Sequence, residues 1–177
     1  MRIDAQGLLI GGEYISSPNC DDRPAGPIEL LVIHNISLPP GEFGGDDVRR
    51  LFTNTLDARA HPYYLALAGL RVSAHFLVRR DGRINQFVPC TKRAWHAGES
   101  CWQGRHCCND FSLGIELEGS DTVPYTNAQY DALHRLTKAL RRAYPIRGIA
   151  GHRDIAPQRK TDPGACFDWS RYLAALP

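Results

Sequence analysis

Three polar residues that lie far apart in the sequence constrain the fold of this chain more than any other feature: His34, His152 and Asp162. His34 follows the apolar run 30–33, which predicts a buried strand that carries the imidazole at its C-terminal end. His152 and Asp162 bracket a proline-containing loop, and prolines limit how far two such side chains can separate. Two imidazoles and one carboxylate are three ligands, the number that leaves zinc a fourth position for water. Either histidine alone is more often a hydrogen-bonded structural residue, but together the three residues predict a fold that closes on one zinc site.

Alternating strand and helix patterns predict a single layered domain. Apolar or alternating runs predict strands at 30–34, 72–78, 83–88 and 113–118, and helical periodicity predicts helices at 46–53, 62–70, 127–143 and 169–176. Thr126 is the expected N-cap of the long helix, with Gln129 three residues later, and 80–82 is the expected hairpin turn. Hairpins mixed with crossover helices indicate a central mixed β-sheet flanked by helices, of the α/β or α+β class. Loops around a cleft are expected at 16–27, 36–45 and 97–110.

Length and charge narrow the class of protein further. At 177 residues and 19.7 kDa, the chain fits one domain spanning 1–177 and is too short for two comfortable ones. The net charge of +2 is spread over interspersed acidic and basic residues, which is not typical of a nucleic-acid or membrane-binding surface. We therefore expect a small-molecule partner, with no nucleic acid, no membrane and no obligate protein partner. The N-terminal residues lack the pattern of a signal peptide, which favours a cytoplasmic location.

The six cysteines agree with that location, because they form no paired CxxC framework and we interpret them as reduced thiols. Cys101, Cys107 and Cys108 lie near one another and near His106, which raises the alternative of a second metal site. Their spacing follows no regular ligand pattern, so the sequence does not favour a metal there.

Several stretches of sequence carry a resemblance to a known family. They are LLVIHNISLPPGEFGG (30–45), LRVSAHFLVRRDG (70–82), RAWHAG (93–98), NDFSLGIELEGSD (109–121), YTNAQY (125–130) and GHRDIAPQRKTDPG (151–164). On these words the chain resembles the zinc-dependent N-acetylmuramoyl-L-alanine amidases, a family that includes phage amidase lysozymes and peptidoglycan recognition proteins. These stretches extend over nearly the whole chain, which makes them far more specific than one short motif.

The resemblance implies the fold of that family, a zinc cofactor and hydrolysis of the amide bond between the lactyl group of N-acetylmuramic acid and L-alanine of the stem peptide. The match is closest to a cytoplasmic branch of the family. This implies 1,6-anhydro-muropeptides as substrates, a place in peptidoglycan recycling, and an effect on β-lactamase induction. Compared position by position, His34, His152 and Asp162 match the zinc ligands of the family, and Glu116 and Lys160 match its catalytic pair.

The chemistry of amide hydrolysis gives Glu116 a role. The reaction needs an activated water, a stabilised oxyanion and a proton for the departing amine. Glu116 lies in an alternating strand, where it shares one face with Glu118 while Leu113 and Ile115 occupy the other. We assign Glu116 as the base that takes the proton from water. The alternative is a surface carboxylate on an edge strand, which is the interpretation we favour for Glu118.

Four further side chains are candidates for the site, each with a simpler alternative. Lys160 lies two residues before the third zinc ligand, where an ammonium can stabilise the oxyanion, but it can equally be a solvated loop lysine. Arg71 can hold a peptide carboxylate with a two-pronged hydrogen bond, although surface arginines are common. Asn35 adjoins the first ligand and can orient it or bind substrate. Trp95 can form an apolar wall for the sugar or the peptide, or fill the core.

Other functions of the same site are also considered. A non-catalytic peptidoglycan-binding module would keep the groove but lose a ligand or the base, and a lytic amidase acting on intact peptidoglycan would need export and often a wall-anchoring repeat. A general zinc peptidase would carry HExxH, which is not seen. The short link 144–150 and the charge of Arg153 depart from the family pattern and bear on the geometry of His152. His75 and His96 are interpreted as structural or groove-lining residues.

Overall fold

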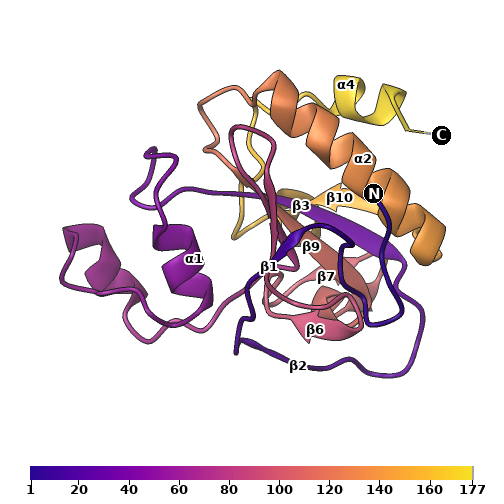
Figure 1. Cartoon of the computed structure of the whole chain (residues 1–177), viewed down its shortest axis with the longest axis horizontal. Helices are drawn as coiled ribbons and strands as arrows, with labels where there is room; N and C mark the ends of the chain where they lie inside the picture. Colours follow the sequence, from indigo (N-terminus) through magenta and orange to yellow (C-terminus); the bar gives the residue numbers. More distant parts are fainter. Residues whose placement is uncertain (177) are drawn as a thin grey trace.

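The computed structural model describes residues 1–176 and is built around a six-stranded mixed sheet (Figure 1). From edge to edge the strands are β1 (Glu13–Tyr14), β5 (Ile84–Gln86), β4 (Phe76–Val78), β9 (Ser112–Glu118), β3 (Leu30–Ile36) and β10 (Gly148–Gly151). β4 and β5 pair antiparallel on either side of the predicted hairpin turn, and all other neighbours pair in parallel. The predicted mixed sheet is confirmed.

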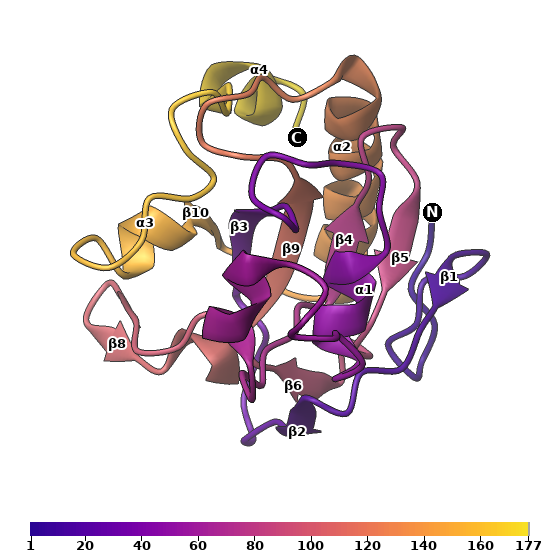
Figure 2. The ribbon, with the colours of Figure 1, turned by 90° about the vertical axis from the view of Figure 1, so that its left-hand side faces the viewer.

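Helices and two small two-stranded sheets surround this sheet. The helical segments are α1 (Asp47–Phe52), η1 (Pro62–Leu67), η2 (Cys108–Asp110), α2 (Asn127–Ala143), α3 (His152–Ile155) and α4 (Trp169–Ala174). The small sheets join β2 (Cys20–Asp22) to β6 (Lys92–Ala94), and β7 (Cys101–Trp102) to β8 (Arg105–His106). α2 and α4 lie together on one side of the central sheet, whereas α1 lies away from them (Figures 1 and 2).

The strand period of two divides the side chains of the central strands between two faces. Ile33 of β3 and Ile115 of β9 face α2 and belong to the main hydrophobic core. The next residues, His34 and Glu116, therefore lie on the face opposite α2. The orientation predicted for Glu116, opposite Ile115, is confirmed, and it leaves the polar ends of two buried strands facing the side of the molecule that holds the long loops.

Several predicted element boundaries were wrong. The strand expected at 72–78 begins only at Phe76, because the preceding backbone bonds to other segments: Ser73 N–H donates to the Trp95 carbonyl and His75 N–H to the Gly114 carbonyl. The helix expected at 62–70 is a 3₁₀ helix that ends at Leu67. Two of the expected loops contain short strands. β2 pairs with β6, which is distant in sequence, whereas β7 and β8 pair with each other and have only two residues each.

The long helix begins and ends where the sequence predicts. The Thr126 hydroxyl accepts from Gln129 N–H at 3.1 Å, and the Gln129 side chain accepts from Thr126 N–H at 3.1 Å, which forms the expected capping box. The Thr126 hydroxyl also donates to the Arg80 carbonyl at 2.7 Å, so the cap ties α2 to the β4–β5 hairpin.

Thr126→Ala is expected to lower the free energy of unfolding by about 1 kcal/mol, because one N–H at the start of α2 loses its acceptor. Urea unfolding followed by circular dichroism measures this change. Thr126→Ser, which keeps the hydroxyl, should retain most of the stability. Equal losses in the two variants would mean that the methyl group, and not the cap, carries the effect.

Candidate active site and metal centre

β3 and β9 place a candidate ligand and the candidate base side by side. The two strands pair in parallel with His34 opposite Glu116 in the register. Both side chains are buried, His34 at 1 % and Glu116 at 8 % exposure. Their relative position is therefore fixed by the hydrogen-bond ladder at the centre of the sheet and does not depend on a loop.

β10 brings the second histidine to the same place. Gly151 pairs with Ile33 one residue before His34, and His152 follows directly as the first residue of α3. The short link before β10 thus ends in a strand that sets the position of His152. Arg153, the neighbouring charge, is half exposed and contacts Asp154 at 3.6 Å.

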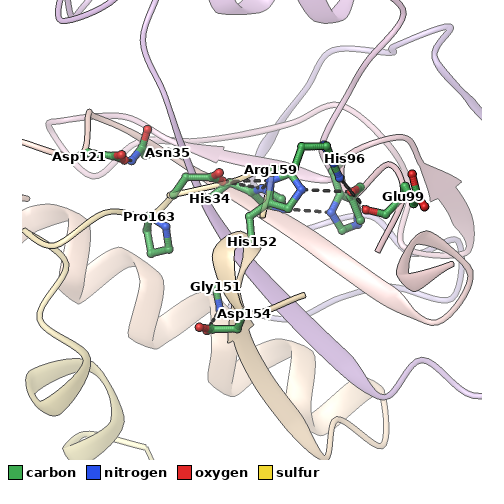
Figure 3. Close-up of polar contacts among 12 residues, drawn as sticks. His34, Asn35, His96, Glu99, Asp121, Gly151, His152, Asp154, Arg159 and Pro163 are labelled. Carbon is green, nitrogen blue, oxygen red and sulfur yellow. Dashed lines mark hydrogen bonds and ion pairs between the residues drawn. The ribbon is translucent and has the colours of Figure 1, made fainter. Parts of the chain in front are cut away.

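The three predicted ligands meet in one triangle. Figure 3 shows its two histidines, His34 and His152. His34 Nδ1 lies 3.0 Å from His152 Nδ1 and 3.0 Å from Asp162 Oδ2, and His152 Nδ1 lies 3.1 Å from the same oxygen. Ligand atoms bound tetrahedrally at ~2.0–2.1 Å from zinc are roughly 3.3 Å apart, so the triangle has the size that a metal ion requires. These residues could hold a metal ion.

Backbone contacts hold the loop that carries Asp162. Arg153 N–H donates to the Asp162 carbonyl at 3.0 Å, and the Tyr125 hydroxyl donates to the Pro163 carbonyl at 2.7 Å. Gly164 has a φ of +81°, and a Cβ there would lie 2.3 Å from the Cα of Asp121. The loop is therefore fixed on both sides of the carboxylate.

The protonation states of the triangle suit a cation. Burial lowers the pKa of His34 to about 4, so its imidazole is neutral near neutral pH. Burial raises the pKa of Asp162, but its contacts with His152 and His34 outweigh burial and hold that pKa below the usual carboxyl range. A neutral imidazole and an ionised carboxylate are the forms that bind metals.

Glu116 differs from Asp162 in lacking a partner. Its Oε2 atom is buried and has no hydrogen-bond partner within residues 1–176. Burial and the nearby Asp162 raise its pKa well above the usual value, and the positive charge of Lys160 acts in the opposite direction. A buried carboxylate oxygen without a partner costs free energy, which is typical of a group kept for catalysis.

Glu116→Gln is expected to stabilise the metal-free protein at alkaline pH relative to the parent chain. Because the folded pKa lies above the usual 4.5, the folded state holds a proton that the unfolded state releases, and stability falls as the pH rises from 4.5 to the folded pKa. Glutamine does not ionise and removes this loss. Melting temperatures at about pH 4 and about pH 8 should diverge only at the higher pH. Exposed Glu99→Gln controls for charge, and a constant difference would contradict the assignment.

A cavity of about 520 Å³ opens over the triangle and Glu116. Its lining includes the predicted residues Asn35, Trp95 and Lys160. Arg71 is exposed and does not line it; it lies at a smaller neighbouring cavity. Apolar side chains of the segment 38–72 and the polar segment 159–162 also line it. The cavity therefore offers both apolar and charged contacts next to the metal-binding group.

The structure narrows the alternatives for several other residues. The Asn35 amide donates to Asp121 Oδ1 at 2.7 Å, and that contact does not orient His34. His96 is buried as expected, but its Nδ1 atom also lies 3.0 Å from Nε2 of His34, a contact that sequence analysis missed. No sequence signal distinguishes such a histidine from an ordinary core histidine.

The interpretation of Glu118 as a surface carboxylate was wrong. β9 is a central strand, and Glu118 is 3 % exposed. Its oxygens accept from Gly44 N–H at 2.6 Å and from Arg80 N–H at 2.9 Å. Arg79 lies 3.7 Å away, so Glu118 ties the loop before α1 to the β4–β5 hairpin.

The cysteines and the helices bear on disulfides, further metal sites and membrane-spanning segments. All six cysteines are free thiols, and within residues 1–176 only the His34 triangle groups enough ligand atoms for a metal. The alternative of a second metal site at Cys101, Cys107 and Cys108, which the sequence did not favour, gains no support from the described residues. Among the described helices, none has the length and apolar character needed to cross a bilayer.

Comparison with known proteins identifies the family. Residues 24–165 match the family model described as N-acetylmuramoyl-L-alanine amidase. The chain belongs to this family. It is 58 % identical to 1,6-anhydro-N-acetylmuramyl-L-alanine amidase AmpD of Escherichia coli (strain K12), over 94 % of this chain and 93 % of that protein. The family assignment made from the matching sequence stretches is confirmed.

Solved structures of family members agree with this fold. A crystal structure of an AmpD derivative superposes with a TM-score of 0.96 at 56 % identity, covering all of both chains. The amidase AmiD of E. coli, in complex with anhydro-N-acetylmuramic acid-L-Ala-D-γ-Glu-L-Lys, superposes with a TM-score of 0.61 at 35 % identity, over 84 % of this chain and 57 % of that one. The family fold is therefore shared, while one domain spanning all of 1–177 stays a prediction.

Proposed function

We propose that this protein hydrolyses the amide bond between the lactyl group of 1,6-anhydro-N-acetylmuramic acid and L-alanine of the stem peptide. The observation that carries the proposal is the buried, unpartnered carboxylate of Glu116 beside the His34–His152–Asp162 triangle at one cavity. The substrate class is supported by the AmpD relatives, which are named for this amide. A binding module would have no need for an unpartnered carboxylate.

The metal of the proposal is zinc, held by His34, His152 and Asp162. Two imidazoles and one carboxylate are a donor set that zinc favours at catalytic sites, and the spacing of the three atoms fits it. When bound, zinc would supply Lewis acidity to a water molecule and to the amide carbonyl. The protein supplies the remaining chemistry.

Glu116 and Lys160 form the proposed catalytic pair. Glu116 takes the proton from the attacking water and returns it to the amine nitrogen that leaves, and its raised pKa suits both transfers. Lys160 lines the cavity, and its charge acts on Glu116 and His34. An ammonium at this position stabilises the oxyanion that forms as water attacks.

Substrate contacts follow from the cavity lining. Trp95 gives an apolar wall for the sugar or the peptide, and Asn35, with its carbonyl oxygen free of the Asp121 contact, can accept a hydrogen bond from substrate. Arg71, at the adjoining smaller cavity, is assigned to a peptide carboxylate further from the scissile bond. The partner is a small muropeptide, without nucleic acid, membrane or an obligate protein.

The proposal places the reaction in the cytoplasm, in the recycling of peptidoglycan fragments. The six free thiols support a reducing compartment. Removal of anhydro-muropeptides there would also restrain β-lactamase induction in bacteria that sense these fragments.

Turnover by the purified zinc-loaded protein tests the function. Anhydro-muramyl peptide and its reducing-end counterpart are offered in parallel, with a chelator-treated control, and released stem peptide is measured by mass spectrometry. Chelator-sensitive release mainly from the anhydro substrate is expected. Equal cutting of both, or cutting of intact peptidoglycan, would favour a broader lytic amidase. Binding without cutting would favour a recognition module.

A further inference from the structure

The second ring nitrogen of His152 decides which nitrogen faces the triangle. Its Nε2 atom lies 3.1 Å from the backbone carbonyl of Ala97. A carbonyl oxygen only accepts, so Nε2 carries the proton and donates it. Nδ1 of His152 is then left with a lone pair directed at the triangle.

The tautomer of His34 is not fixed by its first contact. Nε2 of His34 lies 3.0 Å from Nδ1 of His96, and either imidazole can be the donor. The next contacts resolve this. Nε2 of His96 lies 3.2 Å from the Ser112 hydroxyl, and that hydroxyl donates to the Cys108 carbonyl at 2.5 Å.

The direction of every proton follows from the carbonyl at the end of this chain. Because Ser112 uses its hydrogen on the Cys108 carbonyl, its oxygen accepts from Nε2–H of His96. Nδ1 of His96 is then an acceptor, and it takes the hydrogen of Nε2 of His34. His34, like His152, presents the lone pair of Nδ1 to the triangle.

Two consecutive residues, His96 and Ala97, supply the acceptors for the two ligand histidines. Neighbouring residues hold this segment in place. Asn109 Oδ1 accepts from His96 N–H at 3.2 Å and from Ala97 N–H at 2.8 Å. Gly114 of β9 makes room for the imidazole, because a Cβ there would lie 2.4 Å from Cγ of His96. Figure 3 labels His96 and His34, whose rings are in contact.

We propose that His96 and Ser112 are positioning residues that fix the tautomer of His34, while the Ala97 carbonyl does the same for His152. Both ligands thereby present Nδ1 to the metal-binding triangle. This inference rests on the zinc centre proposed above.

Histidine tautomers in the zinc-loaded full chain test the hydrogen-bond directions. Long-range proton–nitrogen correlation spectra of the protein labelled with ¹⁵N-histidine are expected to show Nε2–H for His34, His152 and His96. We call the chain of contacts from His34 through His96 to Ser112 the relay. His75 is an internal reference, because Gly114 N–H donates to its Nδ1 at 3.0 Å independently of the relay. A proton on Nδ1 of His96 would overturn the proposal.

Zinc affinity in matched variants tests the consequence. Chelator competition should show affinity weakened about 10–100-fold in His96→Leu, which removes the acceptor. His96→Asn places an amide oxygen near the former Nδ1 and should recover most of that affinity. Ser112→Ala, which removes the hydroxyl but leaves the strand, should release His96 from the Nε2–H form and weaken zinc binding, with His75 unchanged.

The outcomes separate this inference from the metal centre itself. If the unaltered chain binds no zinc, the metal centre fails. If it binds zinc and His96→Leu binds equally well, the relay alone is wrong. Equal loss in His96→Leu and His96→Asn, with an altered His75 signal, would show that His96 acts only by filling space.

Discussion

Replacing Glu116 by glutamine is expected to lower turnover by a factor of about 10²–10⁴ while zinc stays bound, because the variant loses the base but none of the metal ligands. Glutamine fills the same space and cannot take a proton from water. Released stem peptide and metal content are measured on the same preparation. The loss should appear mainly in kcat, since the substitution leaves the shape of the proposed substrate cavity unchanged.

The exposed variant Glu99→Gln serves as a charge-matched control and should retain full turnover. Retained activity in Glu116→Gln would remove this carboxylate from the mechanism. Loss of zinc together with activity would instead mean that Glu116 acts by holding the metal centre together.

Removing one ligand of the triangle should abolish metal binding and activity together. In His34→Ala or Asp162→Ala only two protein ligands are left, and the site loses either a neutral donor or its only negative charge. Metal content after dialysis and turnover at saturating substrate should fall in parallel. His134→Ala is the control, because His134 lies on α2 and contacts the Tyr172 carbonyl. Full turnover by zinc-free His34→Ala would exclude a catalytic role for the triangle.

The sequence predicts the centre of the fold better than its periphery. The apolar run that forms β3 and the helical period of α2 are long local signals, and both elements lie where expected. β10 has only four residues, and β7 and β8 have two each. β10 pairs with β3, which is distant in sequence, and β7 and β8 pair with each other over two residues each, so little in their own residues indicates a strand.

The candidate site shows the same division. The sequence could predict one site from His34, His152 and Asp162, because chemistry restricts which side chains bind zinc. The structure brings the three together. Glu118 was misjudged because burial of a charged residue depends on neighbours such as Gly44, whose backbone is placed by tertiary structure. The orientation of His34 depends on a chain of contacts ending at a backbone carbonyl, which composition and spacing cannot encode.

The register between β3 and β9 has a consequence for how this protein can vary. Since His34 and Glu116 occupy paired positions on adjacent strands, the separation of their backbones is a property of the sheet, about one interstrand spacing of ~4.8 Å. The segment 38–72 lines much of the cavity, but it does not include the strands that position His34 and Glu116. Loop exchange in that segment can therefore change which muropeptide fits while the reacting groups keep their separation, so selectivity and chemistry can evolve independently.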